Sequence, residues 1–194
     1  MVINPDKTHY LVCGPRRVAS RRSEVTLVTG GHVIDQSESE VLLGIRVHQS
    51  LSWNSHVRDA KNSVLSQVKT QVNGLKKLVN RANFTTKLMI GNAIVMSKLR
   101  YGICVWGNCQ RYLLKALQVQ QLMAARTICG YKSYYWSTVK LLSVCKWMSV
   151  YQIYVQQVCI LTHRMVTSGR PVTIYNNVIS SFPYKTRATT SNTI

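Results

Sequence analysis

Acidic residues are scarce in this chain of 194 residues, and they are confined to its first third. There are 6 of them, and all lie before residue 60: Asp6, Glu24, Asp35, Glu38, Glu40 and Asp59. From residue 60 to residue 194 the sequence has no carboxylate side chain. Paired acids, a two-metal site or a histidine oriented by aspartate therefore cannot arise inside that stretch. Any catalysis would need the early acids or another chain.

The stretch that lacks acids is strongly basic. It holds 18 of the 25 Lys and Arg residues, and the whole chain has a formal net charge of +19. No salt bridge between side chains can form within it, so its positive charges repel one another unless a polyanion binds. Nucleic acid and an anionic membrane surface are the two polyanions that this pattern leaves open.

Long apolar runs and clustered cysteines are also missing. No segment is apolar enough to span a membrane, and there is no signal peptide, so we expect an intracellular protein of the nucleus or cytoplasm. The six cysteines are widely spread, which is typical of free thiols in a reducing compartment. The pairs Cys104/Cys109 and Cys159/His163 lack CxxC spacing and lie too far apart for a compact finger, so we predict no zinc site.

The first fifty residues carry strand patterns. We predict a strand over 8–13, a loop over 15–22, and a hairpin in EVTLVTGGHVID with a type I′ turn at Gly30-Gly31. This register would pair Leu27 with Ile34 and Val28 with Val33. The run EVLLGIRV, residues 40–47, predicts one further strand, with Gly44 as a bulge or a point of close approach.

After residue 51 the apolar spacing changes from two to about 3.6 residues, which indicates helices. The first is expected to begin at Ser52 or Asn54 and to reach Arg81, burying the stripe that runs from Val57 to Val79. The others are expected at 85–106, 110–128, 137–145 and 148–167. We therefore predict an α+β fold in three parts: a small antiparallel β part (1–50), a mostly helical bundle (51–169) and an irregular tail (170–194).

Several phrases, in order along the chain, resemble the reverse transcriptases of non-LTR retrotransposons, the LINE and jockey-like group. INPDKTHYLVCG is similar to the palm element called motif D, and SEVLLGIRVHQSLSWNSHV to the Leu-Gly hairpin of the primer grip and the entry into the thumb helix. SKLRYGICVWGNC, LKALQVQQLMAARTICGY, STVKLLSVCKWMSV and YKTRATTSN resemble the helical thumb and the region beyond it. Together the phrases cover almost the whole chain.

The resemblance implies a fragment of an RNA-directed DNA polymerase, the palm edge and thumb that grip RNA and DNA as template–primer. The family's Tyr/Phe-x-Asp-Asp strand, whose carboxylates hold Mg²⁺ in the intact polymerase, has no counterpart in this sequence. We therefore expect no polymerase activity and no cofactor bound by the fragment, with the missing palm and fingers as a possible partner. On the same reasoning Met1 would be internal to a longer frame, and Tyr10, Leu11 and Val12 would lie on an under-supported sheet.

The resemblance also implies roles for particular residues. Lys7 matches the motif D lysine, which helps the pyrophosphate leave, although without the metal site a solvated turn lysine is the simpler interpretation. Leu42, Leu43, Gly44 and Ile45 match the primer grip, and an ordinary core strand explains them equally well. The basic residues of the first thumb helix are predicted to contact phosphates without reading bases: Arg58, Lys61, Lys69, Lys76, Lys77 and Arg81.

The stretch GYKSYYWS places Lys132 among four aromatic residues, Tyr131, Tyr134, Tyr135 and Trp136. Such a cluster can stack nucleic-acid bases, but after a glycine that ends a helix it more often packs back on the core. Trp53 and His56 are expected to pack or cap rather than contact bases. Two rival functions stay open: a standalone nucleic-acid-binding module domesticated from such an element, and a basic helical structural protein of a ribonucleoprotein.

Overall fold

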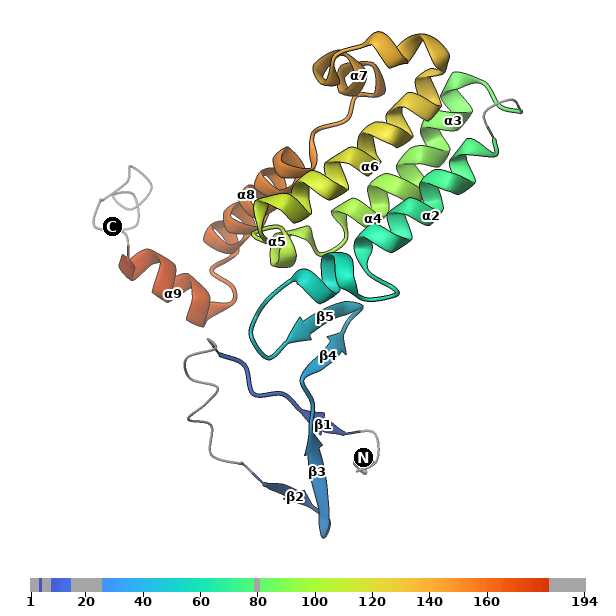
Figure 1. Ribbon diagram of the computed structural model, residues 1–194. Coiled ribbons are helices and arrows are strands. Elements are labelled where there is room, and N and C mark those ends of the chain that lie inside the picture. Colours follow the sequence, from blue (N-terminus) through green and yellow to red (C-terminus); the bar gives the residue numbers. More distant parts are fainter. Residues whose placement is uncertain (1–3, 5–7, 15–25, 79–80, 182–194) are drawn as a thin grey trace, which may run out of the picture. The chain divides into compact units, whose positions relative to one another are not determined.

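The computed structural model describes residue 4 and residues 8–14, 26–78 and 81–181 (Figure 1). Its contacts group Met1–Tyr154 into one compact unit and Val155–Ile194 into a second. The architecture is α+β, as predicted, with small sheets early in the chain and helices after them. The predicted division into three parts, a β part (1–50), a helical bundle (51–169) and a tail (170–194), stays a prediction.

The first sheet has three strands in the order β1-β3-β2: β1 (His9–Tyr10), β3 (His32–Gln36) and β2 (Leu27–Thr29). The predicted hairpin is confirmed, with Leu27 opposite Ile34 and Val28 opposite Val33. Gly30 and Gly31 both have positive φ, 57° and 83°, as a type I′ turn requires. The predicted strand 8–13 was too long, because only two residues pair, and they run parallel to β3.

This sheet buries little apolar surface. Val28 and Val33, paired across the hairpin, are 60% and 63% exposed. Tyr10, Leu11 and Val12 are half-buried. A sheet whose apolar face meets so little of the protein gains little from the hydrophobic effect.

Residues 39–48 form a second hairpin: the Leu-Gly hairpin that the resemblance implied is present, and the single strand that the run 40–47 predicted was wrong. Its strands are β4 (Ser39–Leu42) and β5 (Ile45–His48), which are antiparallel and join through a two-residue turn. In that turn Leu43 and Gly44 have φ of 49° and 78°. Both angles are positive, so the chain reverses where a strand would have continued.

The first predicted helix is interrupted. A short π-helical turn, η2 (Ser55–Asp59), precedes α2 (Val64–Lys76). Between them Ala60 is extended, and the Ser63 side chain accepts a hydrogen bond from the Ser66 N–H at 3.3 Å to cap α2. The helix ends at Lys76 rather than at Arg81, where its last turn tightens into bonds to the third residue back, from the Lys77 N–H to the Gly74 carbonyl oxygen and from the Leu78 N–H to that of Leu75. A new helix then begins behind its own cap, Asn83.

The second predicted helix is also broken. Helix α3 (Phe84–Gly91), the π-helical turn η3 (Asn92–Met96) and α4 (Ser97–Arg100) follow one another directly, and α5 (Ile103–Trp106) comes after a turn. Gly102 makes that turn with φ of 61°, and a Cβ there would lie 2.7 Å from Cδ1 of Ile45. The positive φ favours glycine at this position, and the nearby Ile45 side chain would have to shift to make room for a Cβ.

The later helices match their predictions: α6 (Arg111–Cys129), α7 (Thr138–Cys145) and α8 (Val150–Ser168). A 3₁₀ turn, η4 (Tyr131–Tyr135), joins α6 to α7. The tail predicted to be irregular from residue 170 instead contains α9 (Val172–Ser181), whose apolar residues recur at helical spacing. Residues 182–194 of that tail lie outside the described residues.

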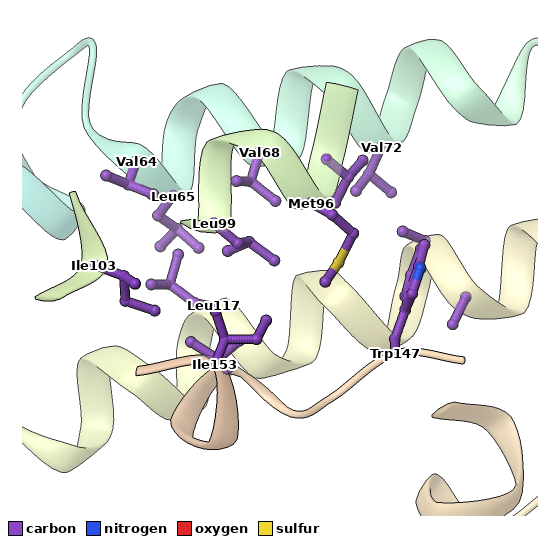
Figure 2. Packing of buried hydrophobic residues seen from close by; sticks show 14 of the residues in the cluster. Val64, Leu65, Val68, Val72, Met96, Leu99, Ile103, Leu117, Trp147 and Ile153 are labelled. Atoms are coloured by element: carbon purple, nitrogen blue, oxygen red, sulfur yellow. The ribbon is translucent and has the colours of Figure 1, made fainter. Parts of the chain in front are cut away.

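The core of the first unit lies between α2, the α3–α5 segment, α6 and the start of α8 (Figure 2). Val64, Val68 and Val72 of α2 face Leu99, Leu117 and Ile153, and all six are buried. Within this core Gln121 is fully buried. Its Nε2 donates to the Met148 carbonyl oxygen at 2.8 Å, and its Oε1 accepts from Nε2 of Gln118 at 2.8 Å, so the amide is satisfied.

Candidate nucleic-acid interface

The tip of the β4–β5 hairpin projects its apolar side chains into solvent. Leu42 is 67% exposed and Leu43 is 82% exposed, so the alternative of a core strand is wrong for these two residues. The tip is held on the helical unit by Tyr101, whose hydroxyl donates to the Leu43 carbonyl oxygen at 2.6 Å. The hairpin therefore presents an exposed Leu-Leu-Gly tip that is anchored from behind.

A cavity of about 290 Å³ lies behind this tip. Strand, turn and helix residues line it: Leu43, Gly44, His56, Val64, Gln67, Lys98 and Tyr101. The exposed Lys98 brings a positive charge to the cavity, and no carboxylate among the described residues pairs with it. The sequence analysis missed both Lys98 and Tyr101, because a sequence pattern does not show which helix turn lies against a hairpin 55 residues earlier.

His56 is the buried polar residue of this region. Its Nδ1 accepts a hydrogen bond from the Arg46 backbone N–H at 3.2 Å, so the proton of the neutral ring is on Nε2. That Nε2 is buried without a partner among the described residues. Burial, and secondarily the charge of Arg46, lower the pKa of His56 below its ordinary value of 6.5. The ring is therefore neutral at pH 7.

Trp53 and His56 pack, as predicted. The His56 ring lies edge-on to the rings of Trp53 and Trp106, with centroid distances of 6.4 and 6.0 Å. The Trp53 Nε1–H donates to Oδ1 of Asn108 at 3.0 Å. These contacts join η2 and the residues just before it to the α5–α6 region.

The six basic residues predicted for one helix are spread over several elements. Lys69 and Lys76 lie in α2, and seven residues of separation place them on the same face, about 10 Å apart. Lys77 caps α2, Lys61 lies in the turn before it, and Arg81 follows it. All five are exposed, so each is accessible to a phosphate.

Arg58 differs from the other five because it already has partners. Its Nε donates to Oδ1 of Asp59 at 2.7 Å, and its guanidinium lies 5.2 Å from the centre of the Tyr112 ring. The hydrogen bond and the charge of Asp59 raise the pKa of Arg58 above its ordinary value. Binding a phosphate here would compete with Asp59, so Arg58 is a weaker candidate than the sequence alone indicated.

Two predicted site residues cannot be placed. Lys7 lies outside the described residues, and for Lys132 only the backbone, in η4, is described. Their predicted roles stay predictions.

The described part of the chain has no group of three or more His, Cys, Asp or Glu side chains that could hold a metal ion. Of the early acids, Glu40 accepts from the Ser37 hydroxyl and lies 3.6 Å from Nδ1 of His9, while Asp59 pairs with Arg58. These carboxylates do not form the cluster that Mg²⁺ requires in the intact polymerases of the resembling family.

Comparisons with known proteins identify no relatives: no family model, no curated protein and no solved structure matches this chain. Among the described residues, no helix combines the length and the apolar character needed to cross a membrane.

Proposed function

We propose that this chain is the part of a non-LTR retrotransposon reverse transcriptase that grips template–primer, without polymerase activity of its own. One observation supports this most: an exposed apolar hairpin tip, held by the Tyr101 hydroxyl, lies on a unit rich in lysines. The sequence after residue 59 has no carboxylate side chain that could pair with these lysines. An exposed tip can press on the sugar-phosphate end of a primer. The lysines of α2 can follow the phosphates of the duplex behind it.

In this proposal the chain contributes binding and orientation only. RNA and DNA are the partners, and the palm and fingers of the polymerase would supply the catalytic carboxylates with their Mg²⁺. With Mg²⁺ and nucleotides, the purified chain is expected to extend no primer.

The proposal is tested by the salt dependence of binding to an RNA–DNA duplex with a recessed 3′ end, followed by fluorescence anisotropy. Six phosphate contacts with a duplex predict a log–log slope on the order of −5, because each contact releases condensed counterions. An affinity that hardly changes with salt would overturn the proposal.

The α2 lysines can be tested separately with the double variant Lys69→Gln/Lys76→Gln. Losing two phosphate contacts should reduce the slope by about 2. The matched control is Asn73→Gln, an exposed uncharged position of the same helix, which should leave the slope unchanged. A lysine variant that binds like the control would exclude α2 from the interface.

The domesticated binding module, the first rival, predicts the same binding. The DNA upstream of the Met1 codon distinguishes these two hypotheses. A reading frame there that encodes a Tyr/Phe-x-Asp-Asp phrase would support the fragment. The ribonucleoprotein rival instead requires co-purification with a stable particle at high salt.

A further inference from the structure

The turn between α6 and α7 exposes two adjacent tyrosines. Tyr134 is 68% exposed and Tyr135 is 86% exposed, at the end of η4. The expectation that this aromatic cluster packs back on the core is therefore wrong for these two residues. It is correct for Trp136, which is half-buried against the core cluster.

The backbone that carries the tyrosines is held firmly. Ser133, immediately before them, is fully buried, and its hydroxyl lies 2.6 Å from the Gly130 carbonyl oxygen and 3.3 Å from that of Arg126. On the other side, the Trp136 N–H donates to the Ser133 carbonyl oxygen at 3.1 Å. The tyrosines are thus presented by a turn that is fixed to the last turn of α6, which lowers the conformational entropy lost on binding.

The surroundings of the two tyrosines are basic. Lys140, on the first turn of α7, has its Nζ 4.9 Å from the centre of the Trp136 ring, directly after the two tyrosines in the chain. No acidic side chain follows residue 59, so none lies near the turn in sequence to neutralise this charge. A partner with flat rings and negative charge fits this surface better than an apolar protein segment does.

We propose that Tyr134 and Tyr135 form a stacking platform for unpaired bases of single-stranded RNA or DNA, with the neighbouring Lys140 on a phosphate. Every base has a π-face, so such stacking tolerates any sequence. A tyrosine ring can be covered while the hydroxyl at its edge stays polar and solvated, which suits side chains that are exposed before binding.

The platform lies at the far end of α6 from the thumb entry. At the beginning of α6, Tyr112 donates to Oδ1 of Asn54 beside η2, and the helix then runs 19 residues to Cys129 (Figure 1). That length is about 28 Å, or roughly 8 nucleotides at 3.4 Å each. This spacing, unlike the platform itself, rests on the proposed function, and it places the stacked bases in a single strand beyond the gripped duplex.

The test uses the full chain with the double variant Tyr134→Ala/Tyr135→Ala and a fluorescent oligo(dT) of about 20 nucleotides. Each stacked base contributes about 1–3 kcal/mol, so one lost stack weakens single-strand binding about fivefold or more. The salt slope should stay the same, because no phosphate contact is removed. Binding of a blunt duplex should also be unchanged, since its bases are already paired and stacked.

Two further variants separate stacking from damage to the fold. Tyr134→Phe/Tyr135→Phe keeps both rings and should bind single strands like the parent chain. Tyr151→Ala, at a tyrosine of α8 that is 60% exposed, is the matched control and should have no effect. An alanine variant with full single-strand affinity would overturn the platform.

The outcomes also distinguish this inference from the proposed function. A tyrosine effect without an α2 lysine effect supports the platform and refutes the proposed phosphate track. A lysine effect without a tyrosine effect does the reverse.

Discussion

Tyr101→Phe removes the hydroxyl that joins the hairpin tip to the helical unit, and nothing else. The lost bond runs to a neutral carbonyl oxygen, that of Leu43, at 2.6 Å, and such bonds contribute about 0.5–1.5 kcal/mol net. Tyr101 is 58% exposed, so water can replace its hydroxyl at the carbonyl. We therefore expect the lower half of that range, about 0.5–1 kcal/mol, which raises the opening equilibrium of the tip about two- to fivefold.

The measurement is native-state hydrogen exchange of the amides in the β4–β5 ladder. Because the hairpin is small, it can open without unfolding the unit, so its amides should exchange faster while those of α6 keep their rates. Tyr151→Phe is the control: Tyr151 is 60% exposed and has no hydroxyl bond among the described residues, and its variant should leave all rates alone. If the ladder amides of Tyr101→Phe are unchanged, or if they accelerate only in parallel with α6, the hydroxyl is not the anchor.

Three further predictions concern stability and reactivity. Leu117→Ala, at a fully buried position of α6, should lower the free energy of unfolding in urea by about 3–5 kcal/mol, whereas Val119→Ala, 52% exposed on the same helix, should cost under about 1 kcal/mol. Since His56 has a lowered pKa when folded, the unfolded chain binds its proton first as pH falls below 6.5. Urea unfolding between about pH 7.5 and 5 should therefore show stability decreasing, a loss that His56→Gln reduces. Finally, burial raises the pKa of the Cys145 thiol to about 12, so iodoacetamide should label exposed Cys13 quickly and Cys145 only after denaturation.

Where the sequence predicted the fold well, several local signals agreed. Helix α6 combines apolar residues at helical spacing with a glycine directly after its last residue, and its predicted bounds differ from the observed ones by one residue. The Gly30-Gly31 hairpin was found for the same reason, because turn chemistry and the pairing of apolar residues pointed to one register.

The errors in the predicted secondary structure arose where a continuous apolar pattern ran through a break or a turn in the chain. Val57 and Val64 are both buried and seven residues apart, so the apolar pattern continues in phase through the break at 60–63. Only the capping role of Ser63 marks that break. In the same way Leu43-Gly44 lacks the Asn or Asp that is usual in a two-residue turn, so the residue pattern of 40–47 predicted a continuous strand and only the resemblance pointed to a hairpin.

The candidate site could be predicted only in part. The exposure of the lysines could be predicted from their charge and from their positions outside the apolar stripe of the helix. The pairing of Arg58 with Asp59 could have been inferred because the two residues are adjacent in the sequence. The cavity that brings Lys98 behind Gly44 depends on how the hairpin docks, which is a matter of tertiary packing. The exposure of Tyr135 likewise depends on the direction in which a single turn leaves α6.

The hydrogen bond of Gln121 to Met148 affects the register in which α6 packs against the rest of the helical core. A slip of α6 by one turn would bring Leu117 or Ala125 to the Met148 carbonyl oxygen, and neither side chain can donate a hydrogen bond. All three residues are buried, so the apolar packing alone discriminates weakly between these registers. In either slipped register the Met148 carbonyl oxygen would lose the Gln121 donor and stay buried without a hydrogen bond, at a cost of about 1–3 kcal/mol. A single polar side chain in an otherwise apolar core thus specifies the register of α6, because apolar contacts alone would tolerate more than one alignment of this helix.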